Sequence, residues 1–359
     1  MLRPSLSVRA TVLRGLLGLS YHLGGPVLSD RLRGKRAMIL IYHGIPGRDH
    51  FEGIANYYGY SIPIEEFERH LVYLKRRCNI VSLGHLITGN GLSRTQTNVV
   101  LTFDDGYENH YLNVFRLLER YDLKAVFALP TAFVREQEPL WDDIIEYAVN
   151  RCKKKQVSME WQGVAHDFVL EDFSGRLALY NWLMRQSVQV EQIRRDEFVD
   201  LALKALAVSA SPDDVFHEQD YRPLTEVQIQ EMVESERVTF ASHSVHHYLL
   251  AKCDRETKRT ELRESKRQVE ELTGLPCTTL CLPGGSYDSE VLDEAFQARY
   301  ESVLTSDTGP VENSKRVLKR NGIFREHYLY RFADLVHGPV LEVLQATCRA
   351  RRAVRAILN

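Results

Sequence analysis

Short apolar segments rich in β-branched residues constrain the fold of this chain most strongly. They are nearly continuous rather than alternating, which is typical of parallel strands buried on both faces. Helical patterns lie between them, as at 63–77, at 108–121 and in the charged segment 254–274, which ends at Gly274. This alternation predicts βα units in a barrel or an open doubly wound sheet. The predicted strands cover residues 37–44, 79–83, 98–106, 124–130, 237–244, 278–285, 302–307 and 316–323.

Most of these segments end on polar or small residues of the kinds that form catalytic sites. Barrel enzymes build their sites from the carboxyl ends of parallel strands. A single polar strand end would mean little, but six of them are hard to explain by packing and predict a site at one end of the sheet. The residues at these ends are His43 and Gly44, Asp104 and Asp105, Pro130 and Thr131, His243 and Ser244, Pro283 and Gly284, and Ser306 and Asp307.

The length of 359 residues is enough for one large domain or two ordinary ones. We expect a barrel over residues 37–333, interrupted at about 134–221 by a helical insertion with a small hairpin near 156–170. The insertion follows a strand end on the predicted catalytic face. We expect it either to shape the substrate site as a lid or to form an additional structural subdomain.

Both ends of the chain are basic and amphipathic. Residues 1–36 carry seven Lys or Arg side chains against one acid, and Arg14 and His22 interrupt the apolar run that a secretory signal would need. No segment has the roughly 20 apolar residues of a membrane span. We expect either that residues 1–36 and a C-terminal helix at 334–359 lie on a membrane surface, or that both are ordinary surface helices. The expected location is cytoplasmic, with peripheral contact at the inner membrane.

Charge and cysteine usage exclude some classes of protein. A net charge of −2 gives no reason to expect a nucleic-acid partner. The six cysteines include no CxxC pair, and we expect reduced, mostly buried thiols rather than a disulfide framework.

The adjacent carboxylates of Asp104 and Asp105 indicate a metal site. Two like charges side by side raise each other's pKa, and a bound cation relieves this cost. One carboxylate can bind the ion while the other acts on a water molecule. The segment ASHSVHHYLL at 241–250 can supply the missing ligands through His243 and His247, with His246 as a rival to His247. Two imidazoles and one carboxylate suit Zn²⁺ and leave a position open for water.

These residues also carry a resemblance to a known family. TFDDG followed downstream by HSxxH resembles the polysaccharide deacetylase family, carbohydrate esterase family 4 or NodB-homology domain, over roughly residues 37–325. In motif style the chain is most similar to the poly-N-acetylglucosamine deacetylases. The resemblance implies an α/β fold, a distorted (β/α)7 barrel. It also implies that Asp104 is the general base and that Asp105, His243 and His247 are the metal ligands.

Two departures from the family pattern affect the site. Where many members have Arg-Pro-Pro-Tyr-Gly, this chain has Leu-Pro-Gly-Gly at 282–285, so we expect it to lack the arginine that orients the base and an aromatic wall. The Leu-x-His that often supplies the general acid has no clean copy, and the nearest is Leu-Val-His at 335–337. The biofilm deacetylases carry that histidine on an early strand, which makes His43 in IYHGI the expected acid. Tyr107, Pro283 and Gly284 are the expected substrate-binding residues.

The resemblance implies a metal-dependent hydrolase that removes an N-acetyl group from an amino sugar of a polysaccharide, oligosaccharide or lipid-linked glycan and releases acetate. The expected cofactor is one divalent ion, Zn²⁺ before Co²⁺, Ni²⁺, Fe²⁺ or Mn²⁺. One alternative is a catalytically inactive barrel that binds glycan or scaffolds polysaccharide assembly, and the altered third motif favours it slightly. Another is a deformylase or amidase acting on a related substrate.

Overall fold

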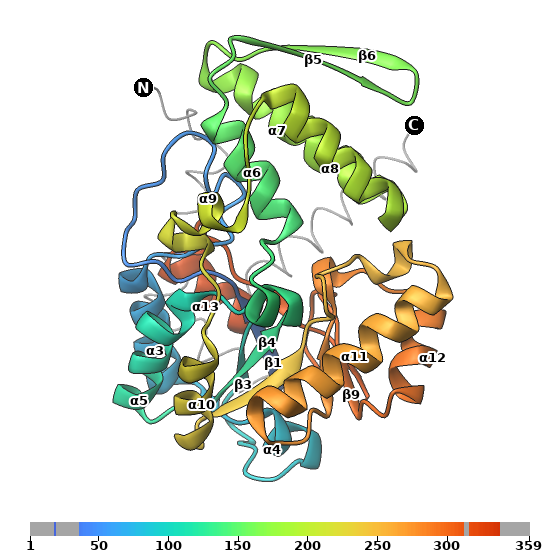
Figure 1. The fold of residues 1–359 in the computed structure, drawn as a ribbon. Helices are drawn as coiled ribbons and strands as arrows, with labels where there is room; N and C mark the ends of the chain where they lie inside the picture. Colours follow the sequence, from blue (N-terminus) through green and yellow to red (C-terminus); the bar gives the residue numbers. More distant parts are fainter. Residues whose placement is uncertain (1–17, 19–35, 312–315, 338–359) are drawn as a thin grey trace, which may run out of the picture.

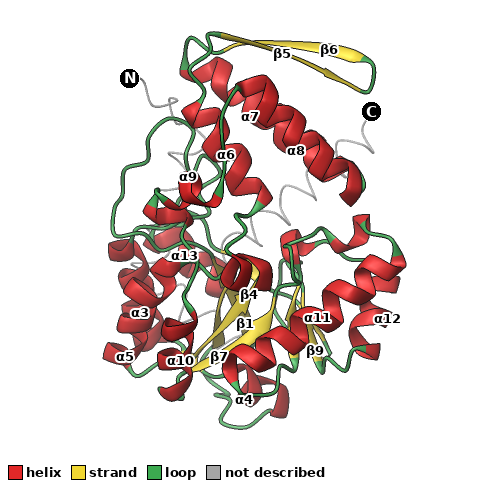
Figure 2. Ribbon diagram, in the orientation of Figure 1, coloured by secondary structure: helices red, strands yellow, loops and turns green. Residues whose placement is uncertain are grey.

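The structure, a computed structural model, describes residues 18, 36–311 and 316–337. A parallel sheet at the centre is surrounded by helices (Figures 1 and 2). Its strands are β1 (Ala37–Tyr42), β2 (Asn79–Ile80), β3 (Asn98–Phe103), β4 (Ala125–Leu129), β7 (Val238–Ser242), β8 (Thr279–Cys281), β9 (Ser302–Leu304), β10 (Val317–Leu318) and β11 (Asn321–Gly322). The helices around the sheet include α3 (Ile64–Arg77), α4 (Leu83–Thr88), α5 (Arg116–Tyr121), α10 (Glu226–Glu234), α11 (Arg255–Thr273), α12 (Ser289–Gln297) and α13 (Leu329–His337).

The order of the strands shows how the sheet curls. The path runs β10-β9-β8-β7-β4-β3-β1-β11, with β2 beside β3, and every pairing is parallel. The two strands at opposite ends of this path, β10 and β11, are joined by Lys319 and Arg320 alone. Because the three residue steps from Leu318 to Asn321 span at most about 11 Å, the two ends of the path meet at this link. The predicted distorted (β/α)7 barrel is therefore confirmed.

Two local predictions differ from the structure. The sequence predicts one strand over residues 316–323, but this segment divides into β10 and β11, which pair with β9 and β1 respectively. A periodicity argument cannot detect such a change of partner within one run. The helix expected at 108–121 begins as a π-helix at His110–Phe115 and continues as α5. The predicted helix at 254–274 is α11, closed by Gly274 in the left-handed conformation that favours glycine.

Alternate residues of the strands build two different interiors. One face packs against the surrounding helices through large side chains, such as Phe67 of α3 and Phe103 of β3. The other face points into the barrel and carries smaller residues: Ile39, Val100, Val126, Ala128, Ala241, Cys281, Leu304 and Leu318. This second set fills the barrel axis, as expected for a small barrel. Polar side chains lie above it, at the carboxyl ends of the strands.

The insertion has a hydrophobic core of its own and lies over one end of the barrel, at the top of Figure 1. Its predicted hairpin is present as an antiparallel pair. The elements of the insertion are α6 (Trp141–Arg151), β5 (Gln156–Trp161), β6 (Val164–Val169), α7 (Phe173–Gln189), α8 (Gln192–Leu206) and α9 (Pro212–Phe216). Because α6 is shared between this core and the cavity described below, the insertion contributes directly to the site.

The predicted terminal segments fall mostly outside the described residues. Only residues 18 and 36 of the segment 1–36, and residues 334–337 of the segment 334–359, are described, the latter within α13. None of the described helices is long and apolar enough to cross a bilayer. The cysteines of the described part are buried and unbridged, and Cys348 lies outside it.

Three buried histidines predict that acid destabilises the fold. His70 stacks on Phe332 with ring centroids 3.8 Å apart, and its Nε2 donates to the carbonyl of His327 at 2.9 Å. Burial outweighs that hydrogen bond and lowers the pKa of His70 to about 3. Burial likewise lowers the pKa of His110 to about 4 and that of His327 to about 4. Each ring is therefore neutral when folded but charged in the unfolded chain below about pH 6.5.

We expect His70→Gln to flatten the pH dependence of stability. Because the unfolded state binds the extra proton, His70 should reduce the free energy of unfolding by about 2 kcal/mol as the pH falls from 7 to 5. Chemical denaturation at both pH values measures the loss in wild type and variant. His85→Gln, at an exposed position, should leave the loss unchanged. A His70→Gln variant that loses as much stability as wild type would contradict the neutral state of His70.

Candidate active site

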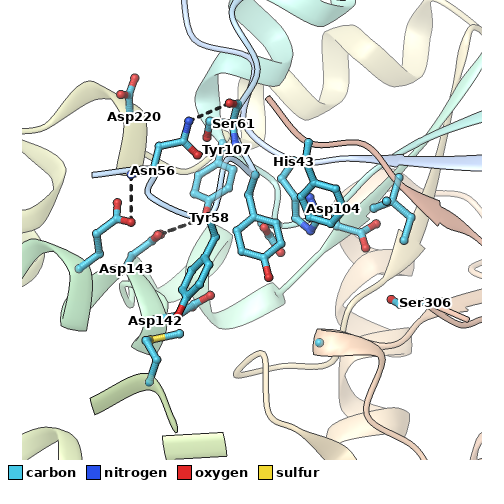
Figure 3. A pocket seen from close by; sticks show the side chains of 18 of the residues that line it. His43, Asn56, Tyr58, Ser61, Asp104, Tyr107, Asp142, Asp143, Asp220 and Ser306 are labelled. Atoms are coloured by element: carbon cyan, nitrogen blue, oxygen red, sulfur yellow. Dashed lines mark hydrogen bonds between the residues drawn. The ribbon is translucent and has the colours of Figure 1, made fainter. Parts of the chain in front are cut away.

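A cavity of about 1160 Å³ lies at the carboxyl ends of the barrel strands. Strand-end residues His43, Asp104, His243, Gly284 and Ser306 line it, as the sequence predicts for a shared site. The insertion forms the opposite side, so that Figure 3 shows His43 and Asp104 across from Asp142 and Asp143 of α6. Thr131 differs from the other strand ends, because its hydroxyl donates to Gln268 of α11 instead.

Three of the predicted residues form a buried cluster suited to a metal ion. One ligand atom from each of Asp105, His243 and His247 lies within 4.8 Å of the other two. The Nε2 atoms of both histidines are 3.4 Å from Oδ1 of Asp105. Burial raises the pKa of Asp105 and lowers the pKa of both histidines, which favours neutral imidazoles. A cation at this point would offset the cost of burying the carboxylate.

The backbone around this cluster is strained. Asp105, Ser244 and His247 have φ of 80°, 61° and 55°, in the left-handed region that side chains other than glycine rarely adopt. Such conformations cost about 1–3 kcal/mol each and persist where the surrounding structure imposes them. Two of the three cluster residues are therefore held by the fold in conformations that the isolated chain would avoid.

Glu261 of α11 holds the loop that carries both histidines. One oxygen of its buried carboxylate accepts from the backbone N–H groups of Val245 and His246, at 2.8 and 3.0 Å. The other oxygen is 2.6 Å from Nδ1 of His246. His246, the rival ligand in the sequence, is thus directed to α11, while His247 joins the cluster. Glu261 was not among the predicted site residues, although it lies on the buried face of α11, where an acid is unusual.

The two clustered histidines have different partners for their second ring nitrogen. Nδ1 of His243 donates to the carbonyl of Cys281 at 2.8 Å, which fixes the tautomer and leaves Nε2 for a ligand. Nδ1 of His247 is buried without a hydrogen-bond partner, and Oδ1 of Asp142 is 3.8 Å away and equally without one. Asp142 belongs to the insertion, so no motif near the barrel strands could have predicted this juxtaposition.

Asp104 is held by an arginine, contrary to the prediction from residues 282–285. Nη1 and Nη2 of Arg320 donate to the two carboxylate oxygens of Asp104 at 2.7 and 2.8 Å, and both residues are buried. Burial alone would raise the pKa of Asp104, but the Arg320 guanidinium, together with the neighbouring His243 and His43, holds that pKa well below its usual range. The expected lack of an orienting arginine is therefore wrong. The arginine comes from the link between β10 and β11 rather than from residues 282–285.

A signal for Arg320 was present in the sequence. It lies within the segment RVLKRNGI at 316–323, which predicts a strand of the sheet, and a fully buried arginine is rarely found without a partner. Its remaining contacts are polar atoms inside the barrel, the hydroxyl of Thr102 and the carbonyl of Thr305. Only the fold could show which carboxylate it meets.

The remaining predicted residues lie at different distances from the cluster. His43 lines the cavity, and its Nδ1 is buried without a hydrogen-bond partner. The Tyr107 hydroxyl donates to Asp143 at 3.1 Å in the cavity wall (Figure 3). Gly284 also lines the cavity, whereas Pro283 is buried and is not part of the cavity lining. His337 does not join the site, because its Nε2 lies 3.7 Å from Sγ of Cys78 in the core.

The fold and the cluster define a class of protein: a parallel α/β barrel with a carboxylate–imidazole site at the carboxyl ends of its strands. A sequence model described as polysaccharide deacetylase matches residues 92–303, more than half of the chain. The chain therefore belongs to the polysaccharide deacetylase family, a family of carbohydrate deacetylases. No curated protein matches the sequence.

Solved structures support the fold. A Streptococcus pyogenes deacetylase in complex with acetate is 17% identical, with a TM-score of 0.56, and the match covers 84% of this chain and 98% of that one. IcaB from Ammonifex degensii is 15% identical, with a TM-score of 0.52, over 85% of this chain and 98% of that one. A polysaccharide deacetylase from Bacillus cereus is 18% identical, with a TM-score of 0.54, over 84% and 69%. At these identities the likeness concerns the fold.

Proposed function

We propose that this protein is a metal-dependent carbohydrate N-deacetylase that releases acetate from an N-acetylated amino sugar. The observation that carries the proposal is the buried cluster of Asp105, His243 and His247 beside an ionised Asp104. The donor set of two imidazoles and one carboxylate fits Zn²⁺ or a similar divalent ion. The acetate bound to the similar Streptococcus pyogenes deacetylase is the product that this reaction would release.

Each residue of the site has a proposed part in the reaction. An ion held by Asp105, His243 and His247 would supply Lewis acidity toward the acetyl carbonyl and an attacking water. Asp104 accepts the proton of that water, because Arg320 keeps its carboxylate ionised and oriented. His43 protonates the departing amine, and the backbone N–H near Tyr107 stabilises the charge that develops on the carbonyl oxygen.

Metal content tests the first part of the proposal. Elemental analysis of purified wild type should find about one equivalent of divalent metal, since the cluster offers one set of ligands. His247→Ala should lose it. His246→Ala is the matched control and should keep it, because that ring faces Glu261. No metal in wild type, even after reconstitution with Zn²⁺, would leave an inactive glycan-binding barrel as the better interpretation.

The product identifies the reaction. Wild type should release acetate, but not formate, from a panel of N-acetylated and N-formylated amino sugars and glycans. Formate release alone would favour the deformylase alternative. Metal without either product would favour a non-carbohydrate amidase with the same site.

Asp142→Asn should weaken metal binding through His247. A ligating histidine usually donates its second ring nitrogen to a carboxylate or carbonyl, and loss of that partner costs about 10–100-fold in metal affinity. Titration of Zn²⁺ into metal-free protein against a competing chelator measures this change without any substrate. Asp143→Asn is the control, since that carboxylate accepts from Tyr107 instead. Equal Zn²⁺ affinities for both variants would show that Asp142 does not support His247.

A further inference from the structure

The exposed aromatic side chains of the described residues are concentrated in one place. Tyr57, Tyr58, Tyr60 and Phe173 are the large aromatic residues with the greatest exposure, at 47%, 42%, 48% and 50%. Their rings form a continuous row. The ring centroid of Tyr57 is 6.2 Å from that of Phe173 and 5.5 Å from that of Tyr58, and the centroids of Tyr58 and Tyr60 are 6.2 Å apart. We call these four residues the aromatic surface. Contiguous exposed apolar surface on a soluble domain commonly marks a binding site.

The aromatic surface is continuous with the active-site cavity. Tyr58 and Tyr60 line that cavity, and the ring of Tyr60 is 5.2 Å from that of His43. At the other end, Phe173 begins helix α7 of the insertion. The surface therefore extends from the proposed general acid to the outside of the molecule, and both the barrel and the insertion contribute to it.

The loop that carries the three tyrosines is held rigidly. Asn56 makes two hydrogen bonds across it, donating to the carbonyl of Ser61 and accepting from the N–H of Ser61, at 2.8 and 2.9 Å. The N–H of Asn56 donates to Glu146 at 3.1 Å and that of Ile54 to Asn150 at 2.9 Å, which fastens the loop to α6. Arg325 donates its backbone N–H to the carbonyl of Gly59 at 2.7 Å on the other side. A rigid loop binds a ligand at a lower entropic cost.

We propose that the aromatic surface binds sugar rings of the same glycan chain that enters the cavity, beyond the residue that is deacetylated. The inference rests on the proposed function, and it makes the substrate an oligosaccharide or polysaccharide rather than a single amino sugar. The apolar C–H faces of sugar rings pack on aromatic faces, while tyrosine hydroxyls bond to sugar hydroxyls.

The surrounding polar groups favour a sugar chain over a lipid surface. The hydroxyl of Tyr58 already donates to Asn181 at 2.7 Å, which leaves the tyrosine oxygen able to accept a hydrogen bond. Carboxylates of Asp142, Asp143 and Glu146 line the same cavity. Their oxygens can accept hydrogen bonds from sugar hydroxyls, which the acyl chains of a lipid cannot donate.

Binding measured against chain length tests the inference. Calorimetric titrations use the full-length Asp104→Asn protein, so that turnover does not contribute to the signal. The ligands are N-acetylglucosamine and its β-1,4 and β-1,6 oligomers of two to six units. We expect affinity to rise with chain length. Adding Tyr57→Ala and Phe173→Ala should weaken binding of the longest oligomers about tenfold, as for loss of a contact of about 1.4 kcal/mol, and leave the monomer unchanged. Val227→Ala, at an exposed position on α10, is the control.

The outcomes separate this inference from the proposed function. Length-dependent binding that the two substitutions weaken supports the aromatic surface even if wild type releases no acetate, which would count against the proposed function alone. Affinity independent of chain length, absence of oligomer binding, or equal affinities with and without the substitutions overturns the inference. Sedimentation with vesicles of phosphatidylglycerol and phosphatidylcholine, if lost in the Tyr57→Ala/Phe173→Ala protein, would show instead that the surface contacts lipid.

Discussion

Asp104→Asn should lower kcat on a deacetylation substrate by about 10²–10⁴-fold, the usual effect of removing a general base. The amide cannot accept the proton of the attacking water, but its side chain keeps nearly the same shape. Because Asp105, His243 and His247 remain, the variant should still bind about one equivalent of metal. Steady-state kinetics at saturating substrate, together with elemental analysis of the same sample, measure both quantities.

The neighbouring aspartate provides the sharpest comparison. Asp105→Asn removes a ligand of the cluster and should lose both metal and turnover, whereas Asp167→Asn, on the exposed hairpin, should change neither. Asp104→Asn also leaves the guanidinium of Arg320 buried without its counter-charge, so circular dichroism and thermal unfolding must show that the variant is folded. Turnover that survives in a folded Asp104→Asn protein would refute the assignment of the base.

Arg320→Met should destabilise the protein by about 3–5 kcal/mol, since removing one partner of a buried ion pair leaves the other charge uncompensated. Arg320 is fully buried and donates to both oxygens of Asp104, so no solvent can replace the lost contact. The free energy of unfolding from denaturant titration measures the effect. Arg120→Met removes an exposed partner of Glu68 and should cost at most about 1 kcal/mol.

A double variant distinguishes loss of the ion pair from loss of packing. Asp104→Asn/Arg320→Met removes both charges, and its destabilisation should be smaller than the sum of the two single effects. If the two effects simply add, then Arg320 stabilises the barrel by filling space rather than by pairing with Asp104.

The parallel barrel was predictable because its strands are buried on both faces and are therefore apolar throughout. The same pattern predicts where the strands end. His243 and His247 were predictable because a metal site beside a carboxylate needs two further ligands, for which imidazoles are suited. Interactions between elements far apart in the chain were not predictable. Arg320 meets Asp104 only because the sheet curls, and Asp142 approaches His247 only because the insertion lies over the barrel. Apolar periodicity predicts which face of an element is buried, but not which polar residue of another element contacts that face.

The position of Arg320 in the last link of the barrel also determines when, during synthesis, the pair of Asp104 and Arg320 can form. A ribosome makes the chain from the amino terminus, so His43, Asp104 and the histidine loop emerge well before residue 320. Until then the barrel has two unjoined edges and the proposed base has no cation beside it. Arg320, which pairs with the proposed base, arrives with the segment that joins β9 to β1, so barrel closure and charge compensation coincide. A nascent or truncated chain that ends before residue 316 would therefore carry all three residues of the cluster but lack the arginine that pairs with the Asp104 carboxylate.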